Sequence, residues 1–476
     1  AQRDNWETTA GEIPFNVVGF AGRGTYAYDN RYLVEVNMGY NGSEQFSPEK
    51  RFGFFPAASL GWVASNEKFF KTITPVLSYL KFRGSYGKVG NDKIVGDRRF
   101  LYFDDITLSS GALGSLGNGQ QVNISLLGNP DITWETATKM NVGVDLGLLK
   151  DFSASFDYFT ENRVDILLTR GTVPVLQGVP VGNLPKVNMG NIFNKGFEVE
   201  LTYNKSFSKD ISLMVKGNYS YNHNKVKFMD EAKRDDSYVY PYHTTGYSLG
   251  QQWGYKIDYS NGNGYFNSQQ ELDDYLAKTK YSFGTPRVGD FKYVDLNGDG
   301  IVDDKDVAPI GYSDLVPRVS YGFMFSLRYK NFELTPFIQG VAKYSHTYSD
   351  QGVYEFVKSI GTYFGYQRTA WTAERYANGE KITYPALSTG QNTNHIANDF
   401  FIMDRSFLRL KNIELAYTLP AGALKRLSVQ GLRVYVSAQN YFVWDKLRMG
   451  HLDPEGADAL GYPVTRSLNV GASITF

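Results

Sequence analysis

Apolar and polar residues alternate one by one along most of this chain, and the alternation predicts β-strands. The clearest stretch is 465–476, in which apolar residues at every second position, ending at Phe476, alternate with Ser, Asn, Gly and Thr. Because successive side chains in a strand point to opposite faces, each stretch would have one apolar and one polar face. Many stretches continue for ten or more residues, whereas strands of globular proteins are usually about five or six residues long. Strands that cross a membrane need roughly 9–11 residues, so the length favours a membrane β-barrel over a soluble β-protein.

The connections between the predicted strands alternate between short turns and long loops. The pattern predicts thirteen strands, at 14–28, 31–43, 53–65, 77–90, 133–148, 151–165, 191–204, 209–225, 316–330, 332–345, 405–419, 427–444 and 465–476. The long, polar, Gly-rich connections are 91–131, 166–190, 226–315, 346–404 and 446–464. Outer-membrane barrels have short turns on the periplasmic side, long loops outside, and Tyr and Phe at both membrane interfaces. We therefore expect an all-β, transmembrane antiparallel β-barrel.

The predicted strand number is odd. Single-chain bacterial barrels have an even number of strands, with both ends of the sheet in the periplasm. On this count we expect residues 1–13 to be the remnant of an extracellular loop, and 14–476 to be the C-terminal part of a larger barrel.

Composition excludes several other classes of protein. The chain has 476 residues, with 35 Tyr, 32 Phe, 48 Gly, no Cys, and 49 basic against 49 acidic residues. The balanced charge argues against a nucleic-acid binder, which needs a basic surface. The absence of Cys excludes disulfides, thiolate metal sites and Cys nucleophiles. No stretch reaches the roughly 18 apolar residues of a transmembrane helix, so a membrane location requires strands. The first residues do not form a signal peptide, and we expect a mature or truncated chain.

Several short motifs follow one another along more than 400 residues of the chain, and their order is informative. They are RFGFFP (51–56), LKFRGSYGKVGN (80–91), NPDITWET (129–136), Asp157-Tyr158, NKGFE (194–198), Gly289-Asp290, DLNGDG (295–300), YKNF (329–332), DRSFLRLKN (404–412), Gln439-Asn440, DPE (453–455), Tyr462-Pro463 and Phe476. This order resembles the SusC-like TonB-dependent transporters of Bacteroidetes outer membranes. The resemblance implies a barrel of about 22 strands, an N-terminal plug, energy from TonB–ExbBD, and a SusD-like surface lipoprotein as lid. The plug and about nine strands would lie outside this sequence.

The resemblance implies the import of oligosaccharides or peptides across the outer membrane. It identifies no substrate residue. A passive outer-membrane porin without energy coupling is the alternative, and a secreted β-sandwich adhesin is a third possibility. An enzyme is not expected, because the five His residues lack zinc-site spacing and no nucleophile-elbow, Walker or dinucleotide motif is present.

One motif has the chemistry of a metal site. The segment 295–306 places oxygen ligands at positions 1, 3, 5, 9 and 12 of a calcium loop, a glycine, Gly300, at position 6, and a backbone carbonyl at position 7. The predicted calcium ligands are Asp295, Asn297, Asp299, Ile301 (through its carbonyl), Asp303 and Asp306. Position 12 is Asp rather than the usual Glu, which resembles dockerin-type loops. We expect a structural calcium ion that stabilises the 226–315 loop; a solvated turn without an ion is the alternative.

Aromatic residues in the long loops are a second group of candidates. They are Trp253, Tyr255, Tyr259, Tyr265, Phe266, Tyr363, Phe364 and Tyr366. These rings would stack on sugars, pack against a lid, or pack against one another. The terminal Phe476 is similar to the C-terminal aromatic residue by which outer-membrane barrels are recognised for assembly.

Overall fold

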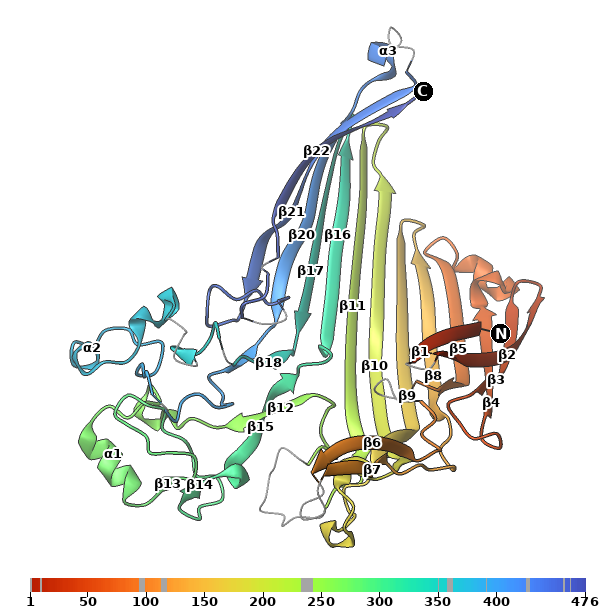
Figure 1. Cartoon of the computed structure of the whole chain (residues 1–476). Helices are drawn as coiled ribbons and strands as arrows, with labels where there is room; N and C mark the ends of the chain where they lie inside the picture. Colours follow the sequence, from red (N-terminus) through yellow and green to blue (C-terminus); the bar gives the residue numbers. More distant parts are fainter. Residues whose placement is uncertain are drawn as a thin grey trace. The chain divides into compact units, whose positions relative to one another are not determined.

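A computed structural model describes the chain except for residues 1, 9–10, 94–98, 113–117, 233–242, 350, 358–362, 391, 425–428, 457–458 and 463 (Figure 1). Contacts divide the chain into two compact units. The first consists of Ala1–Glu200 with Asn222–Lys233 and Thr245–Tyr247, and the second of the remaining residues, mainly Leu201–Tyr221 and Ser248–Phe476. None of the helices in the described part is long and apolar enough to cross a membrane.

The first unit is built from antiparallel strands that pair in sequence order. These are β1 (Gln2–Thr8), β2 (Gly11–Tyr28), β3 (Tyr32–Ser43), β4 (Phe52–Val63), β5 (Leu77–Asn91), β8 (Glu135–Leu148), β9 (Phe152–Thr169) and most of β10 (Lys186–Ser206). The connection between β4 and β5 contains two short 3-10 helices, η1 (Ala64–Asn66) and η2 (Lys68–Thr72).

The second unit continues the same antiparallel pattern. Its long strands are most of β11 (Ile211–Phe228), then β16 (Val319–Tyr329), β17 (Phe332–Ala342), β20 (Phe407–Thr418), β21 (Gly431–Asp445) and β22 (Ser467–Thr475). All thirteen predicted strands are therefore present, and the all-β antiparallel expectation is confirmed.

The expectation for the first residues was wrong. Residues 1–13 were expected to be a loop remnant, but Gln2–Thr8 form β1, which pairs with β2 from Gln2 opposite Val17 to Thr8 opposite Gly11. The sequence of β1, QRDNWET, has no alternation of apolar and polar residues, so its pattern gave no sign of a strand. With β1 the described residues form fourteen strands of the large sheet, and the argument from an odd count no longer holds.

The long strands have one exposed apolar face, as the alternation predicts. In β3, burial alternates residue by residue. The even-numbered side chains are the exposed ones: Tyr32, Val34, Val36, Met38 and Tyr40, between 39% and 53% exposed. In a barrel strand that crosses a membrane, apolar side chains point outward to the lipid and polar side chains point inward.

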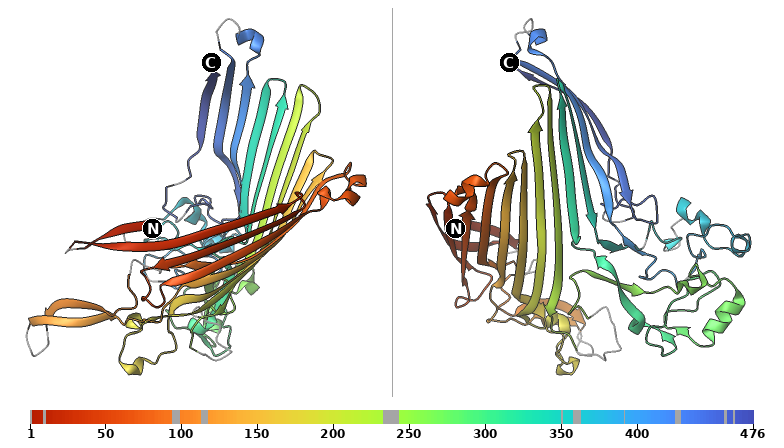
Figure 2. Two further views of the ribbon diagram at one scale, coloured as in Figure 1. Left: turned by 90° about the vertical axis from the view of Figure 1, so that its right-hand side faces the viewer. Right: turned by 180° about the vertical axis from the view of Figure 1, so that it is seen from behind.

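The long loops contain their own short elements. In the first unit, β6 (Asp105–Ala112) and β7 (Asn118–Leu126) form a two-stranded ribbon, which Figure 2 shows projecting away from the long strands. In the second unit, the loops contain β12 (Gln251–Tyr255), α1 (Gln269–Leu276), β13 (Lys280–Tyr281), β14 (Ile301–Val302), η7 (Asp304–Asp306), β15 (Val307–Ser313), β18 (Ser345–Thr347), α2 (Ala373–Ala377) and β19 (Ile402–Asp404). The short connection between β20 and β21 contains α3 (Ala421–Leu424). The long loops are therefore folded rather than extended.

Candidate functional site

Three loops of the second unit pack together around an aromatic core. We call the described residues of 251–313, 345–404 and 446–460 the loop cluster. Its buried aromatic residues are Tyr255, Tyr265, Phe266, Tyr281, Phe291, Tyr293, Tyr348, Tyr354, Trp371, Tyr384, Phe400 and Phe401. Met449 and Leu452 of the third loop pack into the same core. Since burial of aromatic and apolar surface is the main stabilising term in folding, this core makes the loops one compact body.

The core accounts for most of the aromatic residues that the sequence singled out. Tyr255, Tyr265 and Phe266 are 9%, 4% and 0% exposed, so these three rings are packing residues. Trp253 and Tyr366 are partly buried and pack against the core. The ring of Phe364 stacks on that of Tyr366, with centroids 5.9 Å apart. Tyr259 and Tyr363, at 44% and 49% exposed, are the two rings of that group accessible to a ligand.

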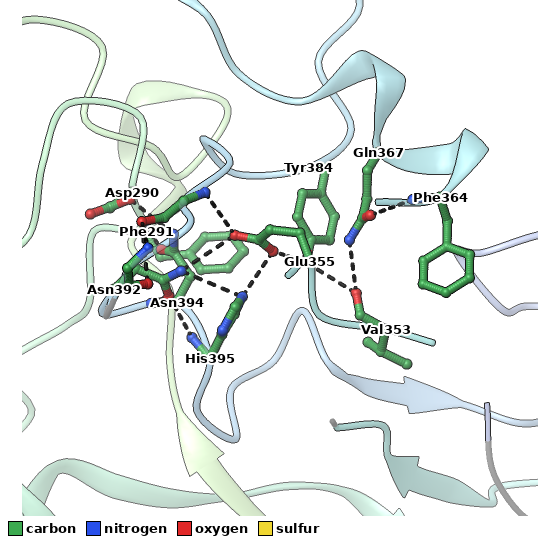
Figure 3. Close-up of polar contacts among 12 residues, drawn as sticks. Asp290, Phe291, Val353, Glu355, Phe364, Gln367, Tyr384, Asn392, Asn394 and His395 are labelled. Carbon is green, nitrogen blue, oxygen red and sulfur yellow. Dashed lines mark hydrogen bonds and ion pairs between the residues drawn. The ribbon is translucent and has the colours of Figure 1, made fainter. Parts of the chain in front are cut away.

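Glu355 lies at the centre of a buried hydrogen-bond network in the loop cluster (Figure 3). Its side chain is 0% exposed. Oε2 accepts hydrogen bonds from the Tyr384 hydroxyl and from His395 Nε2, both at 2.8 Å. Oε1 accepts from the backbone N–H of Ser388 at 3.1 Å and from Asn392 Nδ2 at 3.3 Å. Burial, together with nearby Glu355, raises the pKa of Tyr384, which therefore stays a protonated donor.

A second buried carboxylate joins two of the three loops. Asp290, fully buried, forms an ion pair with Arg287 at 2.9 Å and accepts a hydrogen bond from Asn394 Nδ2 at 2.9 Å. Asn394 Oδ1 in turn accepts from the backbone N–H of Phe291 at 2.8 Å. The two contacts of Asn394 join residues more than one hundred positions apart in the sequence. No catalytic motif indicated them, and the Gly289-Asp290 motif was the only sign in the sequence.

The third loop is fixed to the wall by ion pairs between two of the sequence motifs. Arg409 of β20, whose side chain is 2% exposed, lies 2.6 Å from Asp453 Oδ1 and 2.6 Å from Glu455 Oε2. The contact from Arg409 Nε to Glu455 lacks hydrogen-bond geometry, whereas Nη2 donates to Asp453. Lys411 also pairs with Glu455 at 3.2 Å, and Arg405 donates to the carbonyls of Pro454 and Gly456. The DRSFLRLKN and DPE motifs are thus in contact.

The calcium-type segment forms a compact loop in which the predicted ligands turn towards the backbone. Asp295 accepts hydrogen bonds from the N–H groups of Gly298 and Gly300 at 2.7 and 2.8 Å. Asp306 accepts from Leu296 at 2.7 Å and from Asp303 at 2.8 Å. The turn at position 6 requires glycine, because the φ angle of Gly300 is +84°.

The remaining predicted ligands lie within the same loop. Asn297 Oδ1 accepts from Asp299 N, and Asp299 Oδ1 accepts from Ile301 N, both at 2.9 Å. Ile301 begins β14, and Asp303 caps η7 in a capping box with Asp306. Within the described part, no group of three or more His, Asp or Glu side chains converges as a metal centre. The calcium assignment therefore stays a prediction.

Asp306 is the buried member of this loop. Its side chain is 0% exposed, and burial raises the pKa of its carboxyl group, while three backbone N–H groups oppose that shift. The negative charge of nearby Asp295 raises the pKa further. A positive ion near these two carboxylates would have the opposite effect.

The inward, polar face of the first unit carries an ion-pair ladder. Arg83 on β5 contacts Asp145 on β8 at 3.2 Å and Asp157 on β9 at 2.5 Å. Arg163 on β9 contacts Glu135 on β8 at 3.2 Å and Glu161 on β9 at 3.0 Å. Next to this ladder is a recess of about 500 Å³ in the polar face, whose lining includes Glu35, Ser59, Lys81, Arg83 and Asn141. Such a face suits the water-exposed interior of a barrel.

Comparison with known proteins gives the family. The model of the family described as "TonB dependent receptor-like, beta-barrel" matches residues 3–301, more than half of the chain. The chain belongs to this family of TonB-dependent receptor β-barrels. The expected outer-membrane location is thereby confirmed.

Curated relatives extend the match over nearly the whole chain. TonB-dependent receptor P26 of Formosa agariphila is 28% identical over 497 residues, which cover 97% of this chain and 46% of the relative. TonB-dependent receptor SusC of Bacteroides thetaiotaomicron is 28% identical over 480 residues, which cover 99% of this chain and 45% of SusC. The resemblance to SusC-like proteins is confirmed, and these relatives are receptors rather than enzymes. The chain spans about half the length of the curated relatives it matches.

Solved structures show the same fold. The structure of the RagAB peptide transporter superposes with a TM-score of 0.73 at 20% identity, covering 98% of this chain and 48% of the matched one. The RagAB peptide importer in its closed-closed state gives a TM-score of 0.71, also at 20% identity. This TonB-dependent receptor chain therefore has the barrel fold of those transporters.

Proposed function

We propose that this TonB-dependent receptor chain is part of a SusC-like importer that takes up oligosaccharides or peptides across the outer membrane. The observation that supports this proposal most strongly is the match along 99% of the chain to a protein named SusC. The fold shared with RagAB, whose title names a peptide transporter, supports import and leaves both substrate classes open. A SusD-like surface lipoprotein would deliver the substrate, and TonB–ExbBD would supply the energy.

In this proposal the long strands and the loop cluster have different roles in import. The long strands contribute barrel wall, whose polar face carries the Arg83 and Arg163 ion pairs towards the lumen. The loop cluster would form part of the extracellular mouth, with Tyr259 and Tyr363 as exposed rings for substrate or lid. A plug domain and further strands, which complete a barrel of about 22 strands in this class, would be supplied by the rest of the same transporter.

The test uses the intact transporter in its native outer membrane. We expect uptake of its oligosaccharide or peptide to stop when TonB is deleted, and affinity purification of the transporter to recover a surface lipoprotein. Mass spectrometry of ligand retained by that complex would distinguish a glycan from a peptide. Uptake that continues at the wild-type rate without TonB contradicts active import and supports the passive porin.

We also propose that the 295–306 loop binds a structural calcium ion. The ligands would be Asp295, Asn297, Asp299, the Ile301 carbonyl, Asp303 and Asp306, a set of hard oxygen donors that suits calcium. Oxygens that already accept a backbone N–H keep a second lone pair, so they remain able to coordinate a cation. Calcium content should fall in the double variant Asp295→Ala/Asp299→Ala. Equal content in variant and wild type contradicts the calcium site.

A further inference from the structure

One connection on the short-turn side of the first unit exposes apolar side chains. We call residues 68–76, which contain η2 and lead into β5, the anchor segment. Three of its side chains, Phe69, Ile73 and Val76, are 63%, 47% and 60% exposed. Leu149 of the neighbouring turn is 64% exposed, and its backbone N–H donates to the carbonyl of Val76 at 2.9 Å. A cluster of this kind on a protein surface indicates a contact surface rather than chance exposure.

The segment is fixed to the lipid-facing side of the wall, not to the polar side. Tyr32 and Trp62 are paired residues of β3 and β4 whose side chains belong to the exposed apolar face. Glu67, directly before the anchor segment, accepts hydrogen bonds from the Tyr32 hydroxyl at 2.7 Å and from Trp62 Nε1 at 3.2 Å. Arg31 completes the site with an ion pair to Glu67 at 2.9 Å. Glu67 therefore holds the start of the segment against the apolar face.

The outward face next to the segment has the composition of a membrane interface. Trp62 stacks on Phe82 of β5 with ring centroids 5.7 Å apart, and both rings are exposed on the apolar face. Trp and Tyr with one polar end and one apolar end gather where hydrocarbon meets water. The apolar side chains of the anchor segment continue this aromatic belt at the end of the strands.

The charges of the segment suit lipid headgroups. Lys68 and Lys71 flank Phe69 and Phe70 and are exposed. Neither lysine has an ion-pair or hydrogen-bond partner among the described residues. Alternating basic and apolar side chains allow apolar groups to enter the acyl region while ammonium groups contact phosphates. Phe70, 3% exposed, packs inward and keeps the segment folded.

We propose that the anchor segment inserts into the periplasmic leaflet of the outer membrane, with Phe69, Ile73, Val76 and Leu149 in the acyl region and Lys68 and Lys71 at the phosphates. The side follows from the short connections, which are periplasmic in outer-membrane barrels. The occupant is lipid because the patch is continuous with the lipid-facing wall. A periplasmic protein bound to the same patch is the alternative outcome.

The test places a fluorophore at the segment in the full transporter in liposomes. The 476 residues contain no Cys, so Phe69→Cys and Ile73→Cys each add one labelling site to this chain, and any Cys elsewhere in the full transporter is first replaced by Ser. Lys209→Cys, in the exposed polar turn between β10 and β11, is the matched control on the short-turn side. We expect lipids brominated on the acyl chains to quench the labels at residues 69 and 73 several-fold more strongly than the control label.

Two further measurements keep the result interpretable. Each variant should migrate as a folded barrel on a gel without heating, and Val76→Cys replaces a variant that does not assemble. Quenching at the segment no stronger than at Lys209→Cys overturns the proposal, as does a fall in fluorescence at the segment positions that is equally large in the same lipids without bromine. The assay needs neither substrate nor TonB, so its failure leaves the import proposal untouched.

Discussion

Arg83 of β5 and Asp157 of β9 form a bidentate ion pair although β8 lies between their strands. The contacts are 2.5 Å from Nη1 to Oδ1 and 2.6 Å from Nη2 to Oδ2. Gly143 of β8 is the register partner of both residues. A Cβ atom at Gly143 would lie 2.7 Å from Arg83 Cζ and 2.9 Å from Asp157 Oδ1. The missing side chain of one glycine is what allows the two charges to meet.

The first prediction concerns this glycine. Gly143→Ala should separate Arg83 from Asp157 and lower the free energy of unfolding by about 1.5–3 kcal/mol, the usual value of a hydrogen bond to a charged group. Gly84→Ala is the control, because its added Cβ would approach nothing closer than 3.8 Å. Unfolding of the purified barrel in urea measures both. Equal losses in the two variants would show that the ion pair does not depend on the glycine.

The second prediction concerns the fixed loop. Arg409→Met removes the buried partner of Asp453 and Glu455, and breaking a buried pair in this way costs roughly 3–5 kcal/mol. The two carboxylates are partly exposed, so we expect the lower end of that range. Hydrogen exchange at residues 446–456 should become faster. Lys446→Gln, which breaks an exposed pair with Asp404, should change stability by less than about 1 kcal/mol. Unchanged exchange in Arg409→Met would contradict the role of this arginine.

The third prediction concerns the buried network. Glu355→Gln replaces one acceptor oxygen by an amide group that donates, so it faces donors already directed at that position. The expected cost is about 1–3 kcal/mol, that of leaving a buried polar group unsatisfied. The amides of Ser388 and Phe401 should then exchange faster. The exposed Glu374, replaced by Gln in the same way, should leave these rates unchanged. If both variants behave alike, the network does not stabilise the loop cluster.

The fourth prediction concerns pH and calcium. The raised pKa of Asp306 means that the folded loop favours the protonated carboxyl group. Its stabilising effect is present below the ordinary aspartate pKa and is lost as the pH rises through the raised value. Calcium requires the ionised group, so calcium affinity should increase over that same range, as measured by calorimetry. Asp306→Asn should abolish the increase, whereas Asp304→Asn, at an exposed position, should keep it. An affinity independent of pH would contradict a ligand role for Asp306.

The local pattern of apolar and polar residues was sufficient to locate the long strands, but it did not predict how the loops fold. Alternation is a property of neighbouring residues, so every strand from 14–28 to 465–476 could be located from it. The strand β1 was missed because QRDNWET has no alternation and is recognised only by its pairing with β2. The family resemblance, from motif order, was also accessible from sequence.

The loop cluster depends on contacts that no local pattern contains. Phe291 and Asn394 are 103 residues apart, and Arg409 and Asp453 are 44 apart. The sequence showed the motifs around these residues without showing that they touch. It also left open whether the loop aromatics bind ligands, a question that burial of Tyr255, Tyr265 and Phe266 decides in favour of packing. Calcium binding by the 295–306 loop stays a prediction that rests on its sequence pattern.

The order in which the chain is made has a consequence for the aromatic core of the loop cluster. Its first two segments carry nearly all of the rings, whereas Met449 and Leu452 belong to the connection between the last two strands. Until β21 and β22 have paired, those rings lack the packing of Met449 and Leu452 and can make non-native contacts there. Pairing of β21 with β22 is therefore also the step that adds Met449 and Leu452 to this core. Assembly machinery that delays this hairpin would prolong the time during which the rings are exposed to non-native contacts.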